Sequence, residues 1–130
     1  AAAALVTLGV SALLNGAEEE GSHAYGARLH GLAAAPAARA YAKLTTRDEG
    51  TEVHLYVRGV PPAPGISYEL WCIGADGTRV SAGTFRVGAS GRAYVRMTTA
   101  ARLGEYEKLS VERLAPGQPG QRVMAGTIEY

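Results

Sequence analysis

The sequence has 130 residues but only one Cys, one Trp and one Phe. A single cysteine cannot form an intrachain disulfide, so the fold must be stabilised by its hydrophobic core and not by disulfide bonds. Charged residues are also few, and they give a formal net charge of +1 without any basic stripe. This balance argues against direct binding of nucleic acid. A chain of this length is expected to form one domain that buries enough surface to be stable.

The scarce large side chains are concentrated between Tyr68 and Phe85. Two runs rich in aromatic and β-branched residues flank an Asp-Gly pair there, which predicts a β-hairpin whose turn has a positive φ at Gly77 or Asp76. Large apolar side chains nucleate a core, so the residues predicted to form it are Tyr68, Leu70, Trp71 and Phe85. Cys72 alternates in phase with Tyr68 and Leu70, which favours a small buried side chain over a nucleophile.

The N-terminal part of the sequence differs from the rest. Residues 1–16 are apolar and uncharged, which predicts a short helix forming the outer end of a transmembrane helix, with an alanine-rich soluble helix as the alternative. The acidic run Glu18–Glu20 is more compatible with the outer face of the membrane. Residues 17–36 are interpreted mainly as a linker, with room for one edge strand around 27–32.

Residues 37–130 are predicted to form the folded domain. Residues 39–45 and 51–58 alternate apolar and polar positions around the four-residue loop 47–50. Pairing Thr46 with Thr51 places Tyr41 opposite Tyr56 and Leu44 opposite Val53, and a slip by one residue would turn one apolar set outward.

Further strands are expected at 92–97, 108–114 and 122–130, with a helical turn within 98–106 capped by Thr98 or Thr99. The proline-rich segment 61–65 excludes strand and helix and is expected to carry the chain from one sheet to the other. The predicted fold is therefore all-β, an antiparallel β-sandwich of about seven strands.

No arrangement of residues predicts catalysis or a cofactor. His23, His30 and His54 have no common ligand spacing, so neither a metal nor another cofactor is expected. The segment around Ser90 lacks the spacing of a nucleophile elbow. Glu105, Glu107 and Glu112 are interpreted as a solvated face, and we expect the domain not to be an enzyme.

Tyr41 and Tyr56 are the candidates for binding. Both are predicted to point outward, where they would form an aromatic platform for a sugar or a partner chain. The simpler alternative is that the pair only stabilises the sheet, by roughly 0.5–1 kcal/mol.

Several motifs carry a resemblance to a known family. Pro61-Pro62 precedes a Tyr-x-Leu-Trp strand at 68–71, a return strand at 81–85 follows, and 109–114 and 123–127 supply a late strand and a closing segment. Over roughly residues 39–130 the chain resembles the C-terminal domain of anti-sigma-K-type factors. The signature positions, interpreted as structural, are Tyr68, Leu70, Trp71, Gly83, Thr84, Phe85, Val111, Glu112 and Gly126. Arg113 stands where the family often has another residue.

The resemblance implies a function and a location. In that family a cytoplasmic domain sequesters a sigma factor, one transmembrane helix follows, and the β-domain lies outside the membrane until regulated proteolysis releases the sigma factor. The implied partners are a sigma factor (through a cytoplasmic domain absent from this chain), the membrane and regulatory proteases. A homodimer is a further candidate assembly. The alternative from another class is a cell-surface module that binds carbohydrate or protein.

Overall fold

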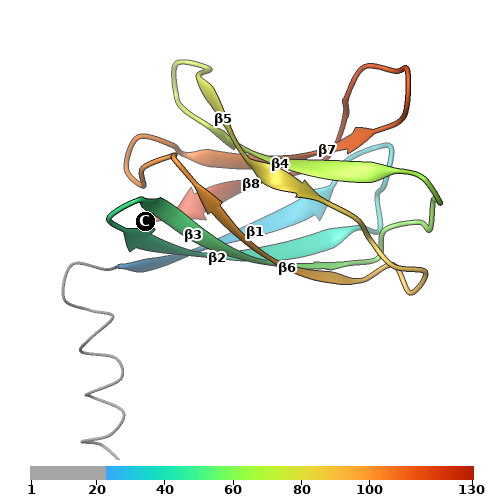
Figure 1. Cartoon of the computed structure of the whole chain (residues 1–130), viewed down its shortest axis with the longest axis horizontal. Helices are drawn as coiled ribbons and strands as arrows, with labels where there is room; N and C mark the ends of the chain where they lie inside the picture. The colour runs from blue at the N-terminus through green and yellow to red at the C-terminus, as the bar shows by residue number, and fades with distance from the viewer. Residues whose placement is uncertain (1–22) are drawn as a thin grey trace, which may run out of the picture.

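The computed structural model describes residues 23–130, which form eight β-strands (Figure 1). In chain order they are β1 (Ala24–Gly31), β2 (Arg39–Arg47), β3 (Gly50–Arg58), β4 (Ser67–Ile73), β5 (Arg79–Phe85), β6 (Ala93–Thr99), β7 (Lys108–Leu114) and β8 (Gln121–Glu129).

All eight strands belong to one antiparallel sheet in the order β5-β4-β7-β8-β1-β2-β3-β6. The sheet curls on itself, so that β4, β5, β7 and β8 face β1, β2, β3 and β6 across the interior (Figure 1). The edge strands β5 and β6 approach each other, and the hydroxyl of Thr99 donates a hydrogen bond to the Ser81 carbonyl (3.0 Å). The all-β prediction is confirmed, but the expected sandwich of about seven strands is corrected to a nearly closed, barrel-like sheet of eight.

Strand β1 accounts for this difference. It pairs with β2 on one side and β8 on the other, and so joins the two faces of the barrel. The linker interpretation is therefore wrong for residues 24–31, which form a central strand and not an edge strand. Ala27 and Leu29 are buried inside, while Arg28 and His30 point outward.

The hairpin of β2 and β3 has the predicted register. Thr46 pairs with Thr51, Tyr41 with Tyr56, and Leu44 with Val53. The strands extend further than expected, because Arg47 also pairs with Gly50 and leaves a two-residue turn at 48–49. The alternation of apolar residues was thus sufficient to fix this pairing.

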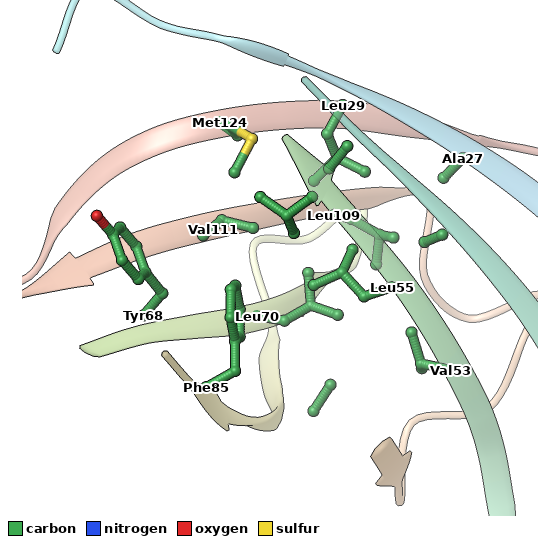
Figure 2. Packing of buried hydrophobic residues seen from close by; sticks show 14 of the residues in the cluster. Ala27, Leu29, Val53, Leu55, Tyr68, Leu70, Phe85, Leu109, Val111 and Met124 are labelled. Atoms are coloured by element: carbon green, nitrogen blue, oxygen red, sulfur yellow. The ribbon is translucent and has the colours of Figure 1, made fainter. Parts of the chain in front are cut away.

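The core fills the barrel with side chains from both faces (Figure 2). Leu29, Leu44, Leu55, Leu70 and Leu109 are its largest fully buried leucines. Among the four predicted core residues, Tyr68, Leu70 and Phe85 are buried. Trp71 is only half-buried and lies on the outer face, because successive side chains of β4 alternate between the two faces.

The connections between strands agree in part with the expectations. Gly77 has φ +87° in the β4–β5 turn, as predicted, and the segment 61–65 carries the chain from β3 on one face to β4 on the other. The expected helical turn within 98–106 is wrong. Strand β6 continues to Thr99, whose hydroxyl accepts a hydrogen bond from the Ala101 amide (3.2 Å), and turns without a helix follow.

Residues 23–130 contain no helix with the length and apolar character needed to cross a membrane. The predicted N-terminal helix at 1–16 lies outside the described residues.

Candidate functional site

The inward-facing signature residues form part of the core. The rings of Tyr68 and Phe85 pair across β4 and β5 and stack with centroids 5.7 Å apart. Leu70 pairs with Val111 across β4 and β7, and both are fully buried. Cys72 lies beside them, and burial raises the pKa of its thiol to about 11. These positions hold β4, β5 and β7 together and point their side chains into the core.

The outward-facing signature residues form a small cluster on β4, β5 and β7. The Arg79 guanidinium lies 4.1 Å from the centre of the Trp71 ring and also donates to the Glu112 carboxylate. Thr84 is exposed on the same side of the hairpin. A cation held on an aromatic face and by a carboxylate has its charge already matched, so this cluster stabilises the surface and offers little to a partner.

Two signature glycines are required by close packing. Gly83 has φ +133°, and a Cβ at this position would lie 3.3 Å from the sulfur of Met97 on the opposite edge strand. A Cβ on Gly126 would collide with the carbonyl oxygen of Arg28 on β1. Both glycines therefore allow the close approach of strands that closes the barrel.

The outer face of β1, β2, β3 and β6 carries a row of aromatic residues. Tyr41 pairs with Tyr56, and Tyr56 in turn pairs with Tyr94. Their exposed fractions are 45%, 48% and 54%. Tyr56 and Tyr94 stack with ring centroids 4.6 Å apart and an interplanar angle of 17°. Arg28 lies opposite Tyr41 on β1 and ends the row.

Basic residues flank this row on both sides. Toward one end of the barrel the neighbouring positions are His30, Arg39 and Arg58, and toward the other end they are Lys43, His54 and Arg96. We call the tyrosine row with Arg28 and these two flanking rows the tyrosine–arginine face. It contains five Lys or Arg residues and no Asp or Glu.

A shallow depression of about 580 Å³ lies beside the stacked rings, lined by Tyr56, Val57, Arg58, Arg92, Ala93 and Tyr94. Its two arginines form no salt bridge with any other residue of 23–130. The depression therefore offers two unmatched positive charges next to exposed aromatic rings.

A hydrogen-bond network borders the face. Glu52 accepts from Nε of Arg47 (3.1 Å) and from Nε2 of His54 (2.6 Å), and Nδ1 of His54 lies 2.9 Å from the Tyr94 hydroxyl. A carboxylate only accepts, so Nε2 of His54 donates to Glu52, and the Tyr94 hydroxyl donates to Nδ1 when that nitrogen carries no proton. The hydrogen bonds from His54 and Arg47 lower the pKa of Glu52 to about 2. The network fixes the position of Tyr94 in the row.

Within residues 23–130, no group of three or more His, Cys, Asp or Glu side chains is arranged to hold a metal ion. Loss of hydration and the neighbouring Tyr56 hydroxyl raise the pKa of Tyr94, so its phenol stays neutral. The Tyr94 hydroxyl is therefore placed as a hydrogen-bond donor to His54.

The structure confirms that Tyr41 and Tyr56 are adjacent and exposed, but sequence reasoning missed the rest of the face. Tyr94 and Arg96 join it only through the pairing of β3 with β6, across about 40 residues of sequence. Period-2 alternation in 92–97 places Tyr94 outward, but it does not show which strand lies next to it.

These features define a small antiparallel β-domain with a packed interior and one distinctive outer face. The chain belongs to the family of anti-sigma-K factor rskA C-terminal domains, whose model matches residues 1–122. The resemblance is thereby confirmed, and the family implies regulation of a sigma factor, its partner. The match begins before residue 39 and so includes β1, whereas it ends within β8, before Gly126. No curated protein and no solved structure matched the chain significantly.

Proposed function

We propose that this chain is the extracytoplasmic regulatory domain of a membrane-anchored anti-sigma factor. The whole protein would sequester a sigma factor through a cytoplasmic domain absent from this chain, until regulated proteolysis releases it. The family match over residues 1–122 carries this proposal, because it includes the apolar segment 1–16 together with most of the barrel. In this arrangement the protein is a single-pass protein of the cell membrane, with the barrel outside.

The position of β1 supports a shielding role for the barrel. The strand begins at Ala24, so residues 17–23 are the whole connection to the apolar segment. Seven residues reach at most about 25 Å when fully extended. A protease that cuts between membrane and barrel must therefore work close to the folded domain, whose position or occupancy would control access to the cleavage region.

We also propose that the domain acts by binding and not by catalysis. The thiol of Cys72 is buried with a raised pKa, and the phenol of Tyr94 stays neutral. A lowered pKa is one of the ways in which a nucleophile is activated, whereas the pKa values of both of these groups are raised.

The test uses the full native protein in its own membrane. Co-purification after detergent extraction, followed by mass spectrometry, should recover a sigma factor, and protease added outside should degrade the barrel. Deletion of residues 24–130 should change the rate at which the sigma factor is released. The absence of a sigma factor, or release kinetics that do not change on deletion, would refute the role.

A second candidate function is a cell-surface module that binds carbohydrate or protein. The exposed row of Tyr41, Tyr56 and Tyr94 favours it, because a contiguous patch of exposed aromatic rings is typical of an interaction site. Recovery of the protein at the cell surface without any transcription partner would support this candidate against the first.

A further inference from the structure

The Tyr41 ring of the tyrosine–arginine face is placed for stacking on a flat ligand, whereas the rings of Tyr56 and Tyr94 stack on each other with centroids 4.6 Å apart. A Cβ on Gly26 would lie 2.7 Å from Oη of Tyr41 and 3.3 Å from two of its ring carbons. The Tyr41 ring therefore lies down over the β1 backbone, with its other face in solvent. Neighbouring strands are about 4.8 Å apart, so the tyrosines on β2, β3 and β6 span about 10 Å. This is the length of a short oligomer and not of a single small molecule.

The charges of the face select an anionic ligand. The face carries +5 from its Lys and Arg residues, whereas the whole chain carries +1, so the remainder carries −4 (+1 minus +5). Arg28, Arg39, Lys43 and Arg58 form no salt bridge with the rest of residues 23–130. Arg96 is 3.5 Å from Glu52, but that carboxylate is already held by Arg47 and His54. Arginine binds a carboxylate or phosphate through two parallel hydrogen bonds.

The position of the face disfavours a lipid surface. The chain enters the barrel at β1, at the end where the loops carry Asp48, Asp76 and Glu105 (the left end in Figure 1). Arg58 and Arg92, with the depression beside them, lie toward the opposite end, whereas Lys43 and Arg96 lie nearer the start of β1. In addition, the outside of a curled sheet is convex, so a planar bilayer would touch few of these residues, whereas a linear polymer can follow the row.

We propose that the tyrosine–arginine face binds an acidic polysaccharide of the cell envelope, with a sugar ring stacked on Tyr41, its neighbours lying along the row of Tyr56 and Tyr94, and carboxylates bound by the flanking arginines. The proposal rests on the extracytoplasmic location argued above, which places the face among such polymers and away from nucleic acid. The polysaccharide would then be the ligand of the regulatory domain, and the domain would report whether this ligand is bound.

Isothermal titration calorimetry of the 130-residue chain tests the proposal with oligogalacturonate as the probe. Two comparison ligands separate the contributions of charge and of the sugar rings. The methyl ester of the same oligomer lacks the charge, and poly-L-glutamate lacks the sugar rings. The variant Tyr41→Phe keeps the aromatic ring and loses only the hydroxyl. The test variants are Tyr41→Ala and the pair Arg39→Gln with Arg58→Gln. The matched charge control is Arg86→Gln with Arg122→Gln, two exposed arginines outside the face. Thermal unfolding of each variant verifies that it is folded.

Binding of oligogalacturonate should exceed binding of the methyl ester and of poly-L-glutamate by roughly tenfold, as expected for the loss of one good charged contact or stacking contact. Tyr41→Ala and the Arg39/Arg58 pair should each weaken it by a similar factor, whereas Tyr41→Phe and the Arg86/Arg122 pair should not. Absence of binding, equal binding of poly-L-glutamate, or unchanged affinity in the test variants would overturn the proposal.

Preferential binding of phosphatidylglycerol vesicles or of oligo-dT would overturn it as well, in favour of a lipid or a nucleic acid. None of these titrations involves a sigma factor. A failure here is therefore distinguishable from a failure of the anti-sigma role, which the co-purification experiment tests separately.

Discussion

Tyr41 on β2 lies over Gly26 on β1, with its hydroxyl 2.7 Å from where a Cβ would stand. Gly26 is directly opposite Lys43, so the tyrosine reaches diagonally across the strand pair to cover it. An aromatic ring over a glycine shields backbone that is otherwise exposed. This contact joins β1, which the sequence interpretation gave mainly as a linker with room for an edge strand, to the predicted binding candidate Tyr41.

The contact predicts a coupling between these two positions. Gly26→Ala should destabilise the domain by about 1 kcal/mol, because the new methyl group displaces the Tyr41 ring. In a Tyr41→Ala background the same change should be neutral, or stabilising by about 0.5–1 kcal/mol, because glycine is intrinsically unfavourable within a strand. Denaturant unfolding of the four proteins measures the coupling. Additive effects of the two substitutions would contradict the placement of the ring.

A second prediction concerns the junction of β8 with β1. Gly126→Ala should destabilise the domain by about 3 kcal/mol or more, since the Arg28 carbonyl occupies the space of the new side chain and overpacking of this kind strains the backbone. Gly88→Ala is the matched control, because its Cβ would make only an ordinary contact, 3.8 Å from the Arg92 carbonyl oxygen. Equal midpoints of thermal unfolding for the two variants would show that the β1–β8 approach is looser than described.

The β2–β3 hairpin and strand β1 show what the sequence was able to predict. The hairpin is local, and its alternating apolar residues admit a single register, so every predicted pair is found. The apolar signal of β1 is short, since only Tyr25, Ala27 and Leu29 face inward, alternating with glycine and polar residues. Its position is fixed by long-range pairing with β8, almost 100 residues later. Local alternation carries no information about such a partner.

Trp71 shows that the size of a side chain is a poor predictor of its burial in a strand. Its size favoured the core, whereas the period of the strand, with Tyr68, Leu70 and Cys72 buried, places it on the outer face. The geometry of the strand takes precedence, and the partly exposed indole is covered by Arg79 instead. The same rule put Tyr41 and Tyr56 outside, but the candidate site extended to Tyr94 and Arg96 only once the pairing of β3 with β6 was known.

The third prediction follows from the lowered pKa of Glu52. In the folded domain this pKa is about 2, below the ordinary value of 4.5, so the carboxylate stabilises the fold at pH values above about 4.5. That contribution is lost as the pH falls from 4.5 through 2, because the group must then be protonated in both states. Glu52→Gln should therefore cost about 1–2 kcal/mol near neutral pH, after allowance for solvent screening, and progressively less toward pH 2.

Urea unfolding at a series of pH values measures this difference. Glu49→Gln, in the exposed β2–β3 turn, is the control for the loss of one negative charge without loss of the network. A stability difference between the native protein and Glu52→Gln that stays constant down to pH 2 would show that the hydrogen bonds to His54 and Arg47 do not hold this carboxylate in solution.

The last prediction concerns the thiol of Cys72. The side chain is 4% exposed among buried residues, and desolvation raises its pKa to about 11, so hardly any thiolate exists at neutral pH and reagents have no access to it. A thiol reagent such as iodoacetamide at pH 7.5 should leave the native domain unmodified and should modify it fully in denaturant. The rate in the native state then reports opening of the barrel, and it should rise in Gly126→Ala, where closure of β8 on β1 is weakened. Rapid modification of the native protein would place Cys72 at the surface and contradict both the burial described here and its assignment as a structural residue.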